Sequence, residues 1–161
     1  MNFTREELLQ PSLSNLRIAK APYSVRTMFV TSFFGGPFAA IAIVAVNSVR
    51  LLRWKRDLAP LVLLFAATGG FFAALQLTPW GQGFVAYLTS LVGRSSLSYI
   101  SRILGLIIFG IGYWLHRKEQ RSADFMGLAR PNGWIGGLAC FVIGIGIVFA
   151  VAISLDHADI P

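Results

Sequence analysis

The first long apolar stretch of the chain extends from residue 28 to residue 49 and reads MFVTSFFGGPFAAIAIVAVNSV. No charged residue interrupts it. A helix of about 20 apolar residues crosses the roughly 30 Å hydrocarbon core of a lipid bilayer. The stretch therefore predicts a membrane-spanning helix at about residues 28–49.

Three further stretches predict spans of the same kind, at about residues 58–77, 97–115 and 134–155. The third is the least regular, because it reaches a sufficient length only by including Arg102. The apolar segment 84–92 is too short to cross as a helix, and it is either interfacial or an extension of the third helix toward solvent. The predicted fold is all-α, an integral membrane bundle of four transmembrane helices.

The composition of the whole chain agrees with a membrane protein. Hydrophobic residues make up 55% of it and charged residues only 13%, whereas about a quarter of the residues of a soluble domain are charged. Lys and Arg number 14 against 7 Asp and Glu. In a membrane protein such an excess is typical of basic cytoplasmic loops, so membrane lipid is an expected partner and nucleic acid is not.

The basic residues also predict an orientation. The loops after the first and third spans each hold four of them: Arg50, Arg53, Lys55 and Arg56, then Arg117, Lys118, Arg121 and Arg130. The six on the other side are more scattered. The positive-inside rule then places both loops in the cytoplasm and both termini outside. The expected location is the cytoplasmic membrane of a bacterium.

The chain divides into three predicted parts. Residues 1–25 are polar and mixed in charge, and they predict an amphipathic segment at the membrane interface rather than a cleaved signal peptide. Residues 26–156 form the four-span membrane domain. Residues 157–161 form a short acidic tail.

The spans lack the groups that membrane enzymes and coupled transporters use. No acidic residue lies well inside a span, and the chain has no serine-nucleophile motif, paired aspartates or zinc-binding motif. Its one cysteine, Cys140, lies in an apolar run and excludes an intramolecular disulfide. The sequence therefore predicts no enzyme activity, no metal and no cofactor.

Small residues recur at four-residue spacing and predict helix-packing or partner faces. The residues concerned are Gly36, Ala40 and, on the continuation of that face, Asn47 in the first span, Gly70 in the second, and Gly136, Cys140 and Gly144 in the fourth. Such ridges let helix backbones approach closely within a membrane. Either they pack the four spans against one another, or one ridge is left for the helix of a partner.

The sequence Gly35-Gly36-Pro37 predicts a kink in the first span, since proline removes a backbone donor and glycine eases the deformation. Kinks of this kind serve helix packing, or they expose backbone groups that bind an ion or substrate.

A polar stripe precedes the third span. On a helix, Arg94, Ser98, Ser101 and Arg102 share one face, and two arginines with hydroxyl groups suit a lipid phosphate or another anion. Alternatively, Arg102 reaches the interface or pairs with Asp156 in a structural ion pair.

Two classes of function follow. The first is a non-catalytic multi-pass membrane protein that binds another membrane protein or a membrane-inserting toxin, as an assembly subunit or an immunity-type partner; it includes association with itself as a homo-oligomer. The alternative is a small oligomeric channel or carrier for an anion or lipid, built around the polar stripe.

Overall fold

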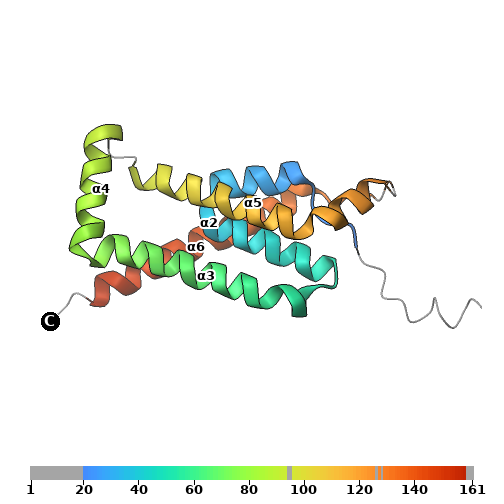
Figure 1. Cartoon of the computed structure of the whole chain (residues 1–161), viewed down its shortest axis with the longest axis horizontal. Helices are drawn as coiled ribbons and strands as arrows, with labels where there is room; N and C mark the ends of the chain where they lie inside the picture. Colours follow the sequence, from blue (N-terminus) through green and yellow to red (C-terminus); the bar gives the residue numbers. More distant parts are fainter. Residues whose placement is uncertain (1–19, 94–95, 126, 128, 159–161) are drawn as a thin grey trace, which may run out of the picture.

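The computed structural model describes residues 20–93, 96–125, 127 and 129–158, with side chains described as far as Ile147. The regular structure of this part of the chain is entirely helical (Figure 1). The helices are α2 (Val25–Arg50), α3 (Trp54–Leu77), α4 (Pro79–Val92), α5 (Ser96–Phe125) and α6 (Gly133–Ala158). By length and composition, α2, α3 and α5 are each able to cross a membrane.

Helix α2 is a hairpin rather than a straight rod. Its helical geometry is broken at Gly36, which divides it into a first arm, residues 25–35, and a second arm, residues 37–50. In Figure 1 the first arm is blue and the second cyan, and the two lie side by side. The arms are about 16 and 21 Å long at 1.5 Å per residue, so each falls short of a bilayer core of about 30 Å.

The reversal has a local cause. Gly36 has φ 72° and ψ −165°, a combination that is accessible almost only to glycine. Pro37 follows with no backbone N–H to donate, so it starts the second arm without leaving a donor unsatisfied. The predicted kink is therefore present, but it turns the chain back on itself.

Polar contacts close the open end of the hairpin. The backbone N–H of Tyr23 donates to Oδ1 of Asn47 at 2.8 Å, and the N–H of Lys20 donates to the carbonyl of Arg50 at 3.0 Å. Nδ2 of Asn47 also lies 3.2 Å from the sulfur of Met28. A straight helix would hold Met28 and Asn47 about 28 Å apart, but here they are in direct contact.

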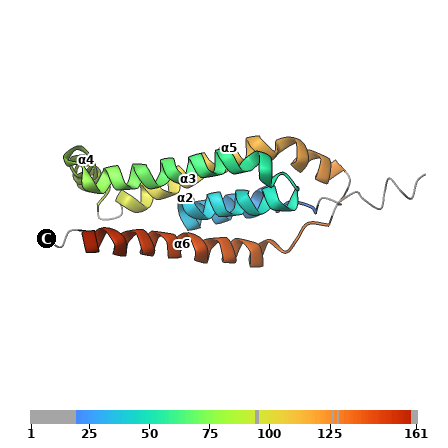
Figure 2. The same ribbon diagram turned by 90° about the horizontal axis from the view of Figure 1, so that it is seen from below.

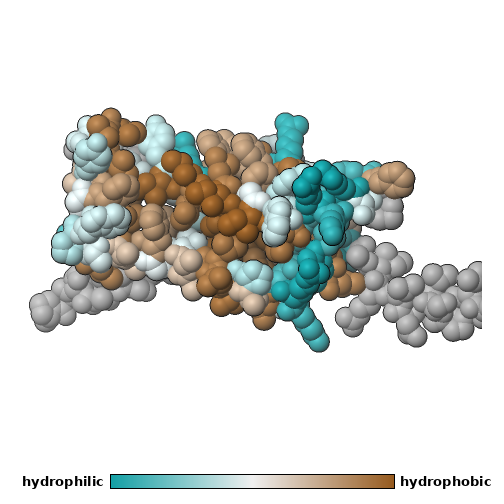
Figure 3. Space-filling view, viewed as in Figure 1, coloured by the Kyte–Doolittle hydropathy of each residue, from teal (hydrophilic) through white to brown (hydrophobic). Residues whose placement is uncertain are grey.

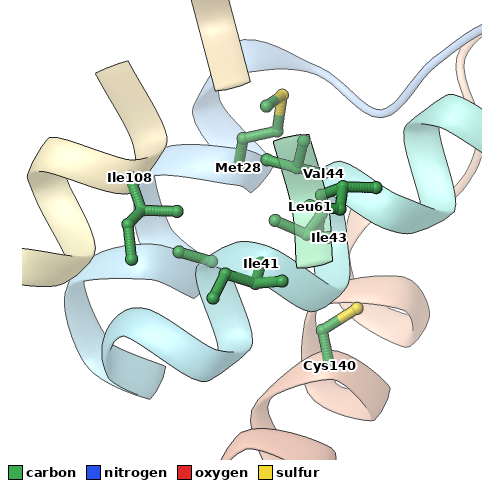
Figure 4. Close-up of a cluster of buried hydrophobic side chains, with 8 residues drawn as sticks. Met28, Ile41, Ile43, Val44, Leu61, Ile108 and Cys140 are labelled. Carbon is green, nitrogen blue, oxygen red and sulfur yellow. The ribbon is translucent and has the colours of Figure 1, made fainter. Parts of the chain in front are cut away.

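The hairpin is the centre of the bundle. Figure 2 shows α6 on one side of it and α3 and α5 on the other, and most of the interhelical contacts involve α2. The buried apolar side chains gather around its second arm: Met28, Ala40, Ile41, Ile43, Val44, Leu61, Ile108 and Cys140 (Figure 4).

Helix α4 joins α3 to α5 and runs across the direction of the other helices in Figure 1. Thr78 caps its start by accepting from the N–H of Gly81 at 3.0 Å, and Pro79 occupies the first turn. Gly93, at φ 83°, ends it. The apolar segment 84–92 is therefore part of a separate helix, and the alternative that it extends the third span is wrong.

Residues 28–49 do not form one straight helix, because the helical geometry is broken at Gly36. Helices α2, α3 and α5 are long and apolar enough to span a membrane, which supports the predicted all-α membrane bundle. That the bundle has four spans stays a prediction. Helix α2 begins and α6 ends at opposite ends of the bundle (Figure 1). The predicted placement of both termini outside the cytoplasm stays a prediction. Residues 1–19 and 159–161 lie outside the described residues.

Candidate functional site

One end of the bundle carries most of the charge. Figure 3 shows hydrophilic residues gathered at the end where α2 begins and ends, next to a mainly apolar middle. This basic end holds all but Arg102 of the described Lys and Arg residues: Lys20, Arg26, Arg50, Arg53, Lys55, Arg56, Arg117, Lys118, Arg121 and Arg130. The polar groups that the fold buries lie just inside it.

A polar cluster of Ser48, Arg53, Asp57, His116 and Glu119 joins three helices at the basic end. Asp57, in the first turn of α3, is fully buried and lies 3.6 Å from Nη2 of Arg53. Its Oδ2 atom lies 3.0 Å from Nε2 of His116 on α5, which is also fully buried. Arg53 pairs with Glu119 as well. The cluster therefore ties the start of α3 to the hairpin and to α5.

The geometry of His116 argues against a serine nucleophile. Nε2 of His116 faces both Ser48 Oγ, at 3.1 Å, and Asp57 Oδ2. A Ser-His-Asp triad instead uses the two ring nitrogens separately, one toward the serine and one toward the aspartate. Nδ1 of His116 is buried and has no hydrogen-bond partner among the described residues. Ser48 itself donates to the carbonyl of Val44 at 3.1 Å, so its proton is used within the helix.

A second polar group supports the entry to the hairpin. Nε2 of Gln120 donates to the carbonyl of Tyr23 at 2.9 Å, and Oε1 of Gln120 accepts from Arg130 at 3.0 Å. Arg130 also pairs with Asp124 near the surface. Because Gln120 is almost fully buried, these contacts satisfy polar groups that would be costly to leave without partners.

Sequence reasoning missed Asp57 and His116 as buried residues, because each lies at the edge of an apolar stretch and reads as part of a basic loop. A signal was nevertheless present, since both loops were predicted on the same side of the membrane. An acidic residue and a histidine at neighbouring helix ends can pair. Their separation in the sequence, 59 residues, hides that relation from any local pattern.

The predicted polar stripe is divided in the structure. Ser101 packs against the tip of the hairpin, where a Cβ atom on Gly36 would lie 2.5 Å from Ser101 Oγ. The guanidinium group of Arg102 lies 5.4 Å from the ring centre of Phe33, and Ser98 is exposed. Arg94 and the side chain of Asp156 lie outside the described residues, so the predicted pair of Arg102 with Asp156 stays a prediction.

The small residues of α6 pack against the entry and the tip of the hairpin. A Cβ atom on Gly144 would lie 2.8 Å from the backbone nitrogen of Ala39, and one on Gly136 would overlap the ring of Tyr23. Cys140, between these glycines, is buried. The face of α6 that contains Gly136, Cys140 and Gly144 is therefore used within the chain.

The predicted faces of α2 are used within the chain as well. Gly36, Ala40 and Asn47 are all buried. Gly105 of α5 meets the tip region so closely that a Cβ atom there would overlap the carbonyl oxygen of Ser32. The irregular backbone at the hairpin tip is thus covered by protein, as a break in a helix at membrane depth requires.

The small residues of α3 face outward. Ala66, Gly70 and Ala74 are exposed, and a Cβ atom on Gly70 would have no neighbour within 4 Å among the described residues. The opposite face of α3 carries its buried residues, among them Leu61 and Thr68. We call the three exposed residues the outer ridge of α3. It is a predicted packing face that the fold leaves open.

Comparison of the chain with protein families, with characterised proteins and with solved structures finds no match.

Proposed function

We propose that the protein is a non-catalytic membrane protein that binds a transmembrane helix of another membrane protein, or of a second copy of itself, through the outer ridge of α3. An assembly subunit and an immunity-type partner both work in this way. The observation that carries the proposal is the exposure of Ala66, Gly70 and Ala74.

The contrast between ridges supports this proposal. Apolar side chains gain little from leaving lipid for a helix interface, so membrane helices associate through close packing at small residues. The small-residue faces of α2 and α6 are already covered inside the chain. The outer ridge of α3 offers the same packing surface without a partner among the described residues. The polar cluster anchors the start of α3, which would hold the ridge at a fixed angle to the bundle.

A photocrosslinking experiment in native membranes tests the proposal. A photoreactive residue at Ala66 should give a discrete protein adduct, because a partner helix lies against it. The change Gly70→Leu should remove that adduct, since the leucine keeps the two backbones apart. The matched control is Gly110→Leu on α5, because Gly110 is also exposed and has no described neighbour within 4 Å. This change should leave the adduct intact.

Two outcomes would contradict the proposal. One is an Ala66 probe that yields only lipid adducts. The other is equal loss of the adduct with Gly70→Leu and Gly110→Leu, which would show that neither glycine lies at a specific contact. The mass of a specific adduct distinguishes a second copy of the chain from a different protein.

An orientation belongs to this proposal. The protein crosses the membrane with α3, α5 and α6, while α2 enters from the basic end and returns to it. The positive-inside rule then places the basic end in the cytoplasm, with the amino-terminal side of α2 inside and the end of α6 outside. In this orientation Lys20 and Arg26 lie on the same side of the membrane as the basic loops.

Reporter fusions test this orientation. A reporter that is active only in the cytoplasm should work before residue 20 and near Lys118, and it should be inactive after Pro161. An inactive amino-terminal fusion together with an active one near Lys118 would mean that α2 crosses the membrane and that the hairpin does not form.

A further inference from the structure

A groove of about 600 Å³ lies between the first arm of α2 and the start of α6. Val30, Phe34 and Leu138 form much of its apolar wall, and each of them is at least 40% exposed. Arg26 and Trp134 lie at the end of the groove that is nearest to the basic end of the bundle. The volume falls within the range of about 300–1,000 Å³ that is usual for small-molecule sites.

Close contacts between α2 and α6 form the floor of the groove. A Cβ atom on Gly133 would overlap the side chain of Thr27, and one on Gly137 would lie 2.8 Å from Oγ1 of Thr31. The two helices therefore touch along these residues, and the larger side chains on either side rise from the contact as walls. The hollow is a consequence of this close packing.

The depth of the groove matches one leaflet of a bilayer. Arg26 and Phe34 are eight positions apart on a helical arm, which corresponds to about 12 Å along its axis. Half of the hydrocarbon core is about 15 Å. With the basic end at the headgroups, the apolar part of the groove lies at the depth of the acyl chains.

The mouth of the groove has the chemistry of a lipid headgroup site. Arg26 is exposed, and no carboxylate of the described residues lies within 4 Å of it. A guanidinium group binds phosphate through two parallel hydrogen bonds. Trp134 is 85% exposed, and tryptophan at this depth prefers the headgroup region. A cation above an apolar groove fits a molecule that is anionic at one end and apolar at the other.

We propose that this groove binds an anionic phospholipid of the cytoplasmic leaflet, with the phosphate on Arg26 and an acyl chain between α2 and α6. The site lies on α2 and α6, apart from the outer ridge of α3, and it relies on the orientation described above but not on a partner protein.

Native mass spectrometry of the delipidated full-length chain tests the proposal, with phosphatidylglycerol or phosphatidylcholine of the same acyl chains added. Phosphatidylglycerol should bind more tightly. Arg26→Gln should weaken its binding about tenfold, as expected for the loss of one charge-assisted contact, and should affect phosphatidylcholine little. Arg56→Gln is the matched control, because Arg56 is exposed at the same end but outside the groove.

A second pair of variants tests the acyl chain. Val30→Trp should fill the groove and abolish the binding of both lipids, whereas Val62→Trp, on an exposed face of α3, should not. If Val30→Trp does not fold, Leu138→Trp fills the groove from the facing helix. Equal effects of Arg26→Gln and Arg56→Gln, or retained binding in a folded groove-filling variant, would overturn the proposal. So would a dimer that Val30→Trp dissociates, because a second copy would then occupy the groove.

Discussion

Helices α2 and α3 have almost the same hydropathy and opposite places in the fold. The most apolar windows of the two have mean hydropathies of 2.0 and 2.1, yet 56% of the α2 window is buried and only 17% of the α3 window. Helix α2 folds back at Gly36 and is covered on several sides, whereas α3 runs without a break and leaves most of its surface open.

The difference between α2 and α3 comes from a few residues rather than from their average character. In α2, Gly36 and Pro37 reverse the chain, and Asn47 holds its two ends together. In α3, Pro60 lies inside the helix, where it removes one backbone hydrogen bond, but the helix continues without a break to Leu77. Hydropathy thus indicates that a segment belongs in a membrane, but it does not show whether that segment crosses it.

The largest loss of stability is expected at Asp57, where α3 is joined to the α2 hairpin. Asp57→Ala would leave Arg53 and His116 without their shared carboxylate, and breaking a buried ion pair costs about 3–5 kcal/mol. Asp124→Ala is the control, because its side chain is 64% exposed in a pair with Arg130, and exposed pairs contribute about 0–1 kcal/mol. Thermal unfolding in detergent measures both. Equal losses would show that the polar cluster does not hold α3 to the hairpin.

The same substitution should have opposite signs in the two regions. Gly36→Ala places a Cβ atom at φ 72° and 2.5 Å from Ser101 Oγ, so we expect a loss of about 3 kcal/mol, the upper end of the range for backbone strain. Gly70→Ala, within an open helix face, should stabilise the protein by about 0.5–1 kcal/mol. The measurement is the free energy of unfolding of each variant. A neutral Gly36→Ala would mean that the hairpin tip does not need glycine.

A smaller loss of stability is expected to distinguish the covered ridge of α6 from the open ridge of α3. Gly144→Leu would force a side chain against the backbone of Ala39, and overpacking of this kind costs about 1–3 kcal/mol. Gly70→Leu should leave the melting temperature of the isolated monomer unchanged, since nothing described lies within 4 Å. A comparable loss in both variants would place Gly70 inside the fold and remove the basis for a partner site on α3.

Much of the secondary structure could be predicted from the sequence. The stretches 58–77 and 134–155 lie within α3 and α6, and the third stretch lies within α5. The end of α5 was underestimated, because residues 116–125 are polar and read as a loop. They remain helical since the face with His116, Gln120 and Ala123 is buried against neighbouring parts of the chain.

The hairpin could not be predicted in full, for a physical reason. Glycine and proline indicate where a helix is deformed, but the direction of the bend depends on which surfaces can cover the broken backbone. Here Ser101 and Gly105 supply that cover, and both are distant in the sequence. The same tertiary packing decides which small-residue ridges are covered and which stay open. The four-residue spacing therefore identified the ridges, but it did not show which of them pack inside the chain.

The hairpin also bears on how the chain is assembled during synthesis. Proteins are made from the amino terminus, and α2 leaves the ribosome before α5 and α6 exist. Until then, the backbone at Gly36 lacks Ser101 and Gly105, which cover it in the complete fold. We therefore expect α2 to stay with the insertion machinery or near the membrane surface until α5 has been made. Its final placement awaits α5, and nascent chains that stop before residue 96 should be unusually sensitive to membrane proteases.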